Sequence, residues 1–409
     1  MNWDELPLKR IAILSSLVIF IGAVSFALWG LKFPAPSATP SEDGGAQPRR
    51  VSTQGGGGFG GDTQLPADTS TATKPLATAP NAQSETPSAN PENEIDLSSL
   101  TLFLASDSRG GVIGFDPNRS AFVRVDPTGI VTNISDDRFR DVKGVTWSLD
   151  RTMAVIEDAS GKTAYNFNTK ERVALPTNWT EFSFAPDNHQ IAFKNMGSNT
   201  NNQYLATTNL SNGSITLLTP LGDRANRVHV DWSPSNSAVG FATIPVDGTT
   251  QQLSFINPDG TLASSATIEG AFFQSKWADS GKIFAFSTAD PQQNFRPKLW
   301  VALGDGEHRG AYQEIPLQTT ANQCSFGAGG RMMVCAVPNR AALDGYGIDG
   351  EITQTSHRIV GIDLATGITK TFYTPPDDAT LSNPVVSKDA KKVYFTNNTT
   401  GKLQVVPVQ

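Results

Sequence analysis

The chain has 409 residues, 38% of them hydrophobic, which allows one large folded domain and excludes a protein that crosses a membrane many times. A formal net charge of -7 excludes the basic surface that nucleic-acid binding needs. Two cysteines exclude a disulfide-rich scaffold, and with four histidines they provide no zinc-binding spacing, so we expect no metal and no cofactor.

An uncharged apolar run lies near the N-terminus. Ile11–Leu31 has 21 residues, which as a helix rising about 1.5 Å per residue matches a hydrocarbon core of roughly 30 Å. Lys9 and Arg10 precede the run, and this basic bias favours a cytoplasmic N-terminus. We therefore expect a cytoplasmic tail at 1–10, a transmembrane helix at 11–31 and an extracytoplasmic remainder. A cleaved signal peptide is the alternative, but its apolar region has only about 7 to 15 residues.

Residues 32–95 are rich in Pro, Ser, Thr, Ala and Gly and contain few large apolar side chains. Such a segment cannot bury enough surface to offset the entropy lost on ordering its backbone. We expect a disordered stalk that separates the membrane from a folded domain at 96–409.

Short apolar, β-branched and aromatic runs follow the stalk and predict an all-β domain. A unit recurs in which an aromatic residue, a small residue and a polar turn lead to an apolar triplet. Its first residues, spaced 37 to 60 residues apart, are Trp147, Phe184, Trp232, Trp277, Phe326 and, with Val in place of the aromatic residue, Val386. This period is typical of one four-stranded blade of a β-propeller, and an aromatic residue in each blade is typical of packing between blades.

A degenerate further copy at 105–115 brings the predicted blade count to seven, with six or eight as the alternatives. The last unit provides only three strands and ends near Val406. We expect an N-terminal strand near Leu100–Leu104 to complete it and close the ring.

The best copies of the unit, Trp232-Ser233-Pro234 and Phe184-Ala185-Pro186-Asp187, resemble the TolB-type propeller repeat, a relative of WD repeats. The resemblance covers about three-quarters of the chain and implies a propeller architecture. It implies no activity, because the motif marks the fold alone.

The two cysteines lie on either side of Gly329-Gly330. If these glycines form a two-residue hairpin turn, Cys324 faces Cys335 across the two strands. An oxidising compartment would then favour a disulfide, whereas two reduced, packed thiols are the alternative.

The segment at 338–357 is the longest predicted connection between the second and third strands of a blade. Long loops in compact domains are often functional, so we interpret Asp344, Tyr346, Asp349 and Glu351 as candidate binding residues. Their spacing does not match a calcium-binding loop.

Polar residues precede several of the repeat aromatics and are predicted to line the central channel. Glu181, His229, Asp231 and Lys276 are the candidates for binding there, and innermost strands that merely meet channel water are the simpler interpretation.

The leading functional hypothesis is a membrane-tethered binding or scaffold module of the cell envelope that contacts a protein or glycan. Sequence signatures of hydrolases are absent, and no catalytic residue is predicted. The alternative is a tethered propeller enzyme of the lyase, glycosidase or quinoprotein type with its site at the channel mouth. That alternative predicts clustered acids or histidines with shifted pKa values.

Overall fold

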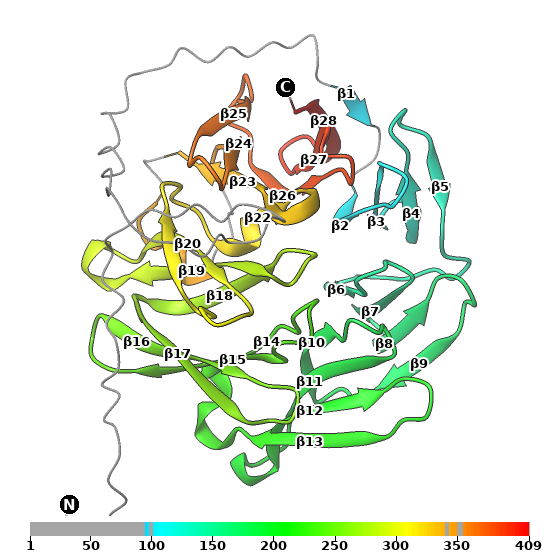
Figure 1. The fold of residues 1–409 in the computed structure, drawn as a ribbon. Coiled ribbons are helices and arrows are strands. Elements are labelled where there is room, and N and C mark those ends of the chain that lie inside the picture. The colour runs from blue at the N-terminus through cyan, green and yellow to red at the C-terminus, as the bar shows by residue number, and fades with distance from the viewer. Residues whose placement is uncertain (1–94, 98–100, 340–342, 350–354, 409) are drawn as a thin grey trace, which may run out of the picture. The chain divides into compact units, whose positions relative to one another are not determined.

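The computed structural model describes residues 95–97, 101–339, 343–349 and 355–408. These residues form seven four-stranded antiparallel sheets, arranged as the blades of a β-propeller (Figure 1). The prediction of an all-β propeller with seven blades is therefore confirmed. In the described part of the chain, no helix is long and apolar enough to cross a membrane, and the predicted span at 11–31 lies outside it.

The blades follow one another in chain order. Blade 1 contains β2 (Leu102–Ser106), β3 (Val112–Asp116), β4 (Ala121–Val125) and β5 (Val131–Asn133). Blade 2 contains β6 (Gly144–Trp147), β7 (Met153–Asp158), β8 (Gly161–Asn166) and β9 (Arg172–Leu175). Blade 3 contains β10 (Trp179–Phe184), β11 (Gln190–Met196), β12 (Gln203–Asn209) and β13 (Ile215–Pro220). Blade 4 contains β14 (Val228–Val230), β15 (Gly240–Pro245), β16 (Thr250–Ile256) and β17 (Leu262–Glu269). Blade 5 contains β18 (Ala271–Trp277), β19 (Ile283–Asp290), β20 (Arg296–Leu303) and β21 (Tyr312–Ile315).

Blade 6 contains β22 (Cys324–Phe326), β23 (Met332–Pro338), β24 (His357–Asp363) and β25 (Thr369–Tyr373). Blade 7 contains β26 (Leu381–Val386), β27 (Lys392–Asn397) and β28 (Lys402–Pro407), and β1 (Ile95–Leu97) is its fourth strand. The described helices are short: η2 (Thr200–Asn202), η3 (Gly222–Arg227), η4 (Pro291–Gln293), η5 (Ala321–Gln323), η6 (Ala328–Gly330) and α2 (Tyr346–Asp349).

The second strand of each blade carries the predicted apolar triplet and lies in the core. In β19, seven consecutive residues are buried, because neighbouring blades cover both faces of this strand. The repeat aromatic wedges between blades: Trp277 of blade 5 stacks on Phe241 of blade 4 and packs beside Phe284 of its own blade. These contacts confirm that the repeat aromatic is a packing residue.

A buried serine explains the small residue that follows the repeat aromatic. The Ser148 hydroxyl accepts a hydrogen bond from the backbone N–H of Met153, and Ser387 receives the same bond from Lys392 at the same distance of 2.9 Å. Each hydroxyl also bonds the aspartate two residues later, Asp150 or Asp389. The motif thus encodes the turn between the first and second strands of a blade.

The ring closes through β1, which pairs with β28 from Ile95 opposite Val405 to Leu97 opposite Leu403. The predicted closing strand near Leu100–Leu104 was therefore placed wrongly. Residues from Leu102 onward are needed as β2, the innermost strand of blade 1, where Leu102 pairs with Phe115 of β3. The closing strand begins one residue before the predicted domain boundary.

Four innermost strands contain a β-bulge that the sequence pattern did not predict. The residue next to each interruption of the ladder has a positive φ between 51° and 56°, a backbone region that side chains other than glycine rarely adopt. These residues are Phe103, Glu181, Phe272 and Asn383.

Antiparallel order gives the ring two different faces. Connections between second and third strands, and those between blades, lie on one face, which we call the loop face. Connections between first and second strands and between third and fourth strands lie on the other, which we call the turn face.

Candidate functional site

The four predicted channel residues lie on or directly after the innermost strands of three consecutive blades. Glu181 is in β10, His229 in β14 and Lys276 in β18, while Asp231 directly follows β14. The structure therefore brings them to one side of the ring axis, as the sequence predicts for first strands.

Two of the channel residues, Glu181 and Asp231, are hydrogen-bonded to neighbouring side chains. The buried Lys194 ammonium donates a hydrogen bond to the Glu181 carboxylate. Ser275 donates to the Asp231 carboxylate at 2.6 Å, and Trp277 Nε1 donates to the Asp231 carbonyl at 3.0 Å, so blade 5 holds Asp231 of blade 4.

Burial shifts the pKa values of His229, Asp231 and Lys276, which with Glu181 form what we call the channel cluster. It lowers the pKa of His229 to about 4, assisted by the positive charge of Lys194. It raises the pKa of Asp231 to about 6, although the Ser275 hydrogen bond and Lys276 oppose the rise. The protein packed around Lys276 also lowers the pKa of this lysine, although part of its side chain is exposed to solvent.

Arg151 was missed by the sequence reasoning. It lies in the turn after β6 of blade 2, yet its guanidinium is 3.7 Å from the Asp279 carboxylate of blade 5. Burial lowers its pKa against the opposing effect of Asp279 and Asp150. No spacing rule could have predicted this contact, because only ring closure brings blades 2 and 5 together.

Charges in this cluster largely neutralise one another, as Glu181 with Lys194 and Asp231 with Lys276 illustrate. In the residues that the structure describes, no group of three or more His, Cys, Asp or Glu side chains is arranged to hold a metal ion.

The loop face carries the other candidates. Asp344 is exposed and accepts a hydrogen bond from Arg296 Nε at 2.6 Å. Tyr346 lies in α2 with its ring buried, and burial raises its pKa to about 12 against the effect of the Thr319 and Thr320 hydroxyls. Tyr346 therefore packs inward and presents little surface to a partner. Asp349 ends α2, and Glu351 lies outside the described residues.

Residues 343–349, the described middle part of the long connection, fold back onto blade 5. The backbone N–H of Gly345 bonds the carbonyl of Asn294, and that of Gly347 bonds the carbonyl of Phe295 at 2.9 Å. A Cβ atom on Gly347 would come within 2.6 Å of that same carbonyl, so glycine allows the close approach.

A cavity of about 320 Å³ lies beside this docked segment, on the loop face of blade 5. It is lined by Asp290, Gln293, Arg296, Pro297, Lys298, Leu299, Glu314, Ile315, Pro316, Leu317 and Gln318. Sequence reasoning did not identify it, because its walls come from two separate segments of blade 5 with no shared motif.

Lys298 lines this cavity and forms ion pairs with two carboxylates. Lys298 Nζ is 2.9 Å from a Glu269 carboxylate oxygen and 3.2 Å from one of Asp290. Burial alone would lower the pKa of Lys298, but these two carboxylates outweigh it and raise that pKa. Burial also raises the pKa of Glu314, which Lys298 opposes and Glu269 reinforces.

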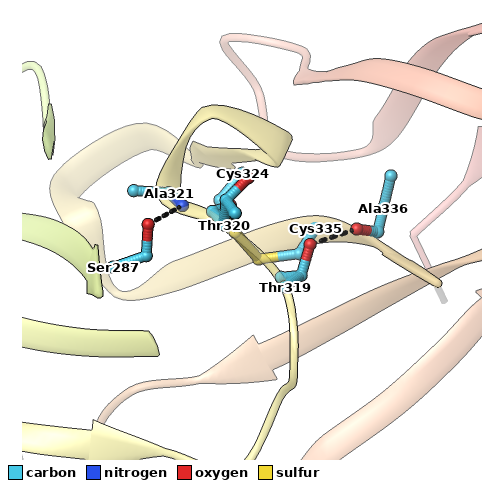
Figure 2. The surroundings of a disulfide bond; sticks show 7 residues. All are labelled: Ser287, Thr319, Thr320, Ala321, Cys324, Cys335 and Ala336. Atoms are coloured by element: carbon cyan, nitrogen blue, oxygen red, sulfur yellow. Dashed lines mark hydrogen bonds between the residues drawn. A yellow bond between two sulfur atoms is a disulfide. The ribbon is translucent and has the colours of Figure 1, made fainter. Parts of the chain in front are cut away.

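The chain that follows the cavity-lining residues is held by both blade 5 and blade 6 (Figure 2). Thr319 donates a hydrogen bond to the carbonyl of Ala336 at 2.7 Å, and the N–H of Ala321 donates to the Ser287 hydroxyl at 2.9 Å. Directly after them, Cys324 of β22 is joined to Cys335 of β23 by a disulfide. The predicted pairing of the cysteines is confirmed, although the connection beyond Phe326 and Met333 is longer than a two-residue turn.

No family model matches the chain, and no curated protein matches its sequence. Solved structures do. An oligogalacturonate lyase in complex with manganese is 12% identical with a TM-score of 0.51, and the match covers 77% of this chain and 93% of that one.

Two further structures match less well. TolB from Acinetobacter baumannii is 12% identical with a TM-score of 0.38, over 73% of this chain and 63% of that one. The Cps50 (Swd1) β-propeller domain from Myceliophteria thermophila is 13% identical with a TM-score of 0.46, over 78% and 99%. TolB and a WD-like propeller are thus among the structural neighbours, and sequence identities of 12% and 13% indicate a likeness of fold alone.

Proposed function

We propose that this protein is a membrane-anchored, extracytoplasmic propeller that binds a protein partner through the loop face of blade 5. The cavity beside residues 343–349 carries this proposal, since it is a concave part of the face on which the longest connection lies. A protein is favoured over a glycan because charged, polar and aliphatic side chains line the cavity, and none of its described lining residues has an aromatic ring that could stack on a sugar.

Two observations support the location. The disulfide between Cys324 and Cys335 is of the kind that persists in oxidising compartments outside the cytoplasm. The apolar run Ile11–Leu31 has the length and the basic flank of a signal anchor.

Catalysis at the channel is the second candidate function. The shifted pKa values of His229 and Asp231 favour it, because perturbed groups cluster at active sites. The mutual neutralisation of the cluster favours a structural role, so we place binding first and propose that the chain is not an enzyme.

A pull-down from cross-linked membranes tests the proposed face. The full-length protein is compared with a variant carrying Gln293→Arg and Gln318→Arg, two exposed residues of the cavity rim. The control carries Glu307→Arg and His308→Arg, which are exposed on the turn face of the same blade. We expect a specific partner that the first variant loses and the control keeps. Equal recovery by both would exclude this face.

A further inference from the structure

The outer edge of blade 5 is shorter than that of its neighbour. In blade 4, β17 pairs with β16 along its whole length, from Thr250 to Ile256. In blade 5, β21 pairs with β20 only from Leu299 to Ala302, so β20 lacks an outer partner at Arg296, Pro297 and Lys298.

Proline 316 causes this early end. It follows the last residue of β21 and has no N–H to donate to a ladder. The N–H of Leu317 bonds the carbonyl of Ile315 at 2.7 Å, a tight turn around Pro316 that directs the chain away from β20. The uncovered residues of β20 then become a wall of the cavity.

The charges that line the cavity are unequally paired. Arg296 and Lys298 are its only lining cations among the described residues, and each already contacts carboxylates: Arg296 contacts Asp344, and Lys298 contacts Glu269 and Asp290. Glu314 is the second carboxylate of the lining beside Asp290, and it makes no hydrogen bond to the described part of the chain. Asp290 is paired with Lys298, whereas Glu314 is available to a ligand.

We propose that this cavity binds an extended segment of the partner protein carrying a lysine or arginine, whose cationic side chain pairs with Glu314. The segment lies where β21 would continue past Ile315, and an exposed strand edge is a common place for an extended peptide. Pro316 and Leu317 provide the apolar contact beside the charge. The inference rests on the proposed function, for which it supplies the chemistry of the partner.

Pools of immobilised heptapeptides test the pairing. Six positions are randomised, and the central residue is fixed as lysine, arginine, glutamate or leucine. The full-length protein in detergent is applied to each pool. We expect at least about tenfold more retention on the lysine and arginine pools than on the glutamate pool, a ratio equivalent to about 1.4 kcal/mol.

Glutamate variants identify the residue responsible. Glu314→Gln should bring this ratio close to one, while Glu307→Gln, the same change on the turn face of blade 5, should leave it unaltered. A ratio near one for the unmodified protein, or a high ratio that survives Glu314→Gln, would overturn the inference.

The proposed function is judged separately. If the pull-down partner is lost with the Gln293 and Gln318 substitutions while the peptide ratio is near one, the face binds a partner by other chemistry. If the pull-down partner is indifferent to the face, the proposed function fails together with this inference.

Discussion

Blades 4 and 5 share their inner architecture and differ at their outer edges. In both, the second strand has buried residues in the core, Phe241 in blade 4 and Phe284 in blade 5, and Trp277 of blade 5 packs against the core of blade 4. At the edge, β17 covers β16 completely, whereas β21 stops at Ile315 and leaves a charged cavity. The difference indicates that inner strands maintain the ring, while the outer end of a blade is free to vary in shape.

The largest effect on the free energy of unfolding is expected in the inner strands of the blades. Trp277→Ala removes a buried ring that contacts Phe241 and Phe284 and should lower the free energy of unfolding by about 3–5 kcal/mol. Phe272→Ala in the same strand is the control, because that ring is 48% exposed, and should cost under about 1 kcal/mol. Urea unfolding followed by circular dichroism measures both. Equal losses would show that the repeat aromatic is not a special packing residue.

The disulfide of blade 6 should have the next largest effect. Replacing Cys324 and Cys335 by alanine should lower the free energy of unfolding by about 2–3 kcal/mol, since the bond closes a short loop in the unfolded chain. Urea unfolding with and without a reductant provides the control. The unmodified protein should lose stability on reduction and the double variant should not. Insensitivity of the unmodified protein would contradict the disulfide.

The channel cluster predicts a pH effect. Asp231 has a pKa of about 6 when folded against 3.8 ordinarily, so its contribution to the free energy of unfolding falls as pH rises between about 4 and 6. His229 and His357, with folded pKa values of about 4 against 6.5, contribute in the opposite direction over about pH 4 to 6.5.

Asp231→Asn should therefore make the free energy of unfolding rise more steeply with pH across that window, by about 3 kcal/mol. Unfolding measured at a series of pH values tests this, with Asp279→Asn as the control. An unchanged profile for Asp231→Asn would show that the carboxylate of Asp231 is not held as the contacts indicate.

The smallest effect on stability is expected at the outer edge of blade 5. Glu314→Gln removes a charge that makes no hydrogen bond to the described residues, and the free energy of unfolding should change by less than about 0.5 kcal/mol. The same urea unfolding experiment measures it. A loss of several kcal/mol would mean that Glu314 maintains the fold, and the contrast between inner strands and outer edge would disappear.

Much of the inner architecture could be predicted from sequence because local patterns encode it. The spacing from Trp147 to Val386 gave the blades, and symmetry about Gly329-Gly330 gave the pairing of Cys324 with Cys335. Each of these relations depends on neighbours within one blade.

Long-range features could not be predicted in this way. Ile95–Leu97 and Leu102–Ser106 are both short strands, and only the completed ring decides which one pairs with β28. The positive φ of Glu181 and Phe272 follows from bulges that neither residue type favours. Arg151 meets Asp279 through a contact that no sequence motif marks.

Site-specific photocross-linking in living cells tests the binding face most directly. A photoreactive benzoylphenylalanine is placed at Gln318, on the cavity rim, or at His308, on the turn face of the same blade. We predict one discrete adduct from position 318, absent from position 308 and lost when Glu314→Gln is added. No adduct from position 318, or the same adducts from both positions, would contradict a partner at this face.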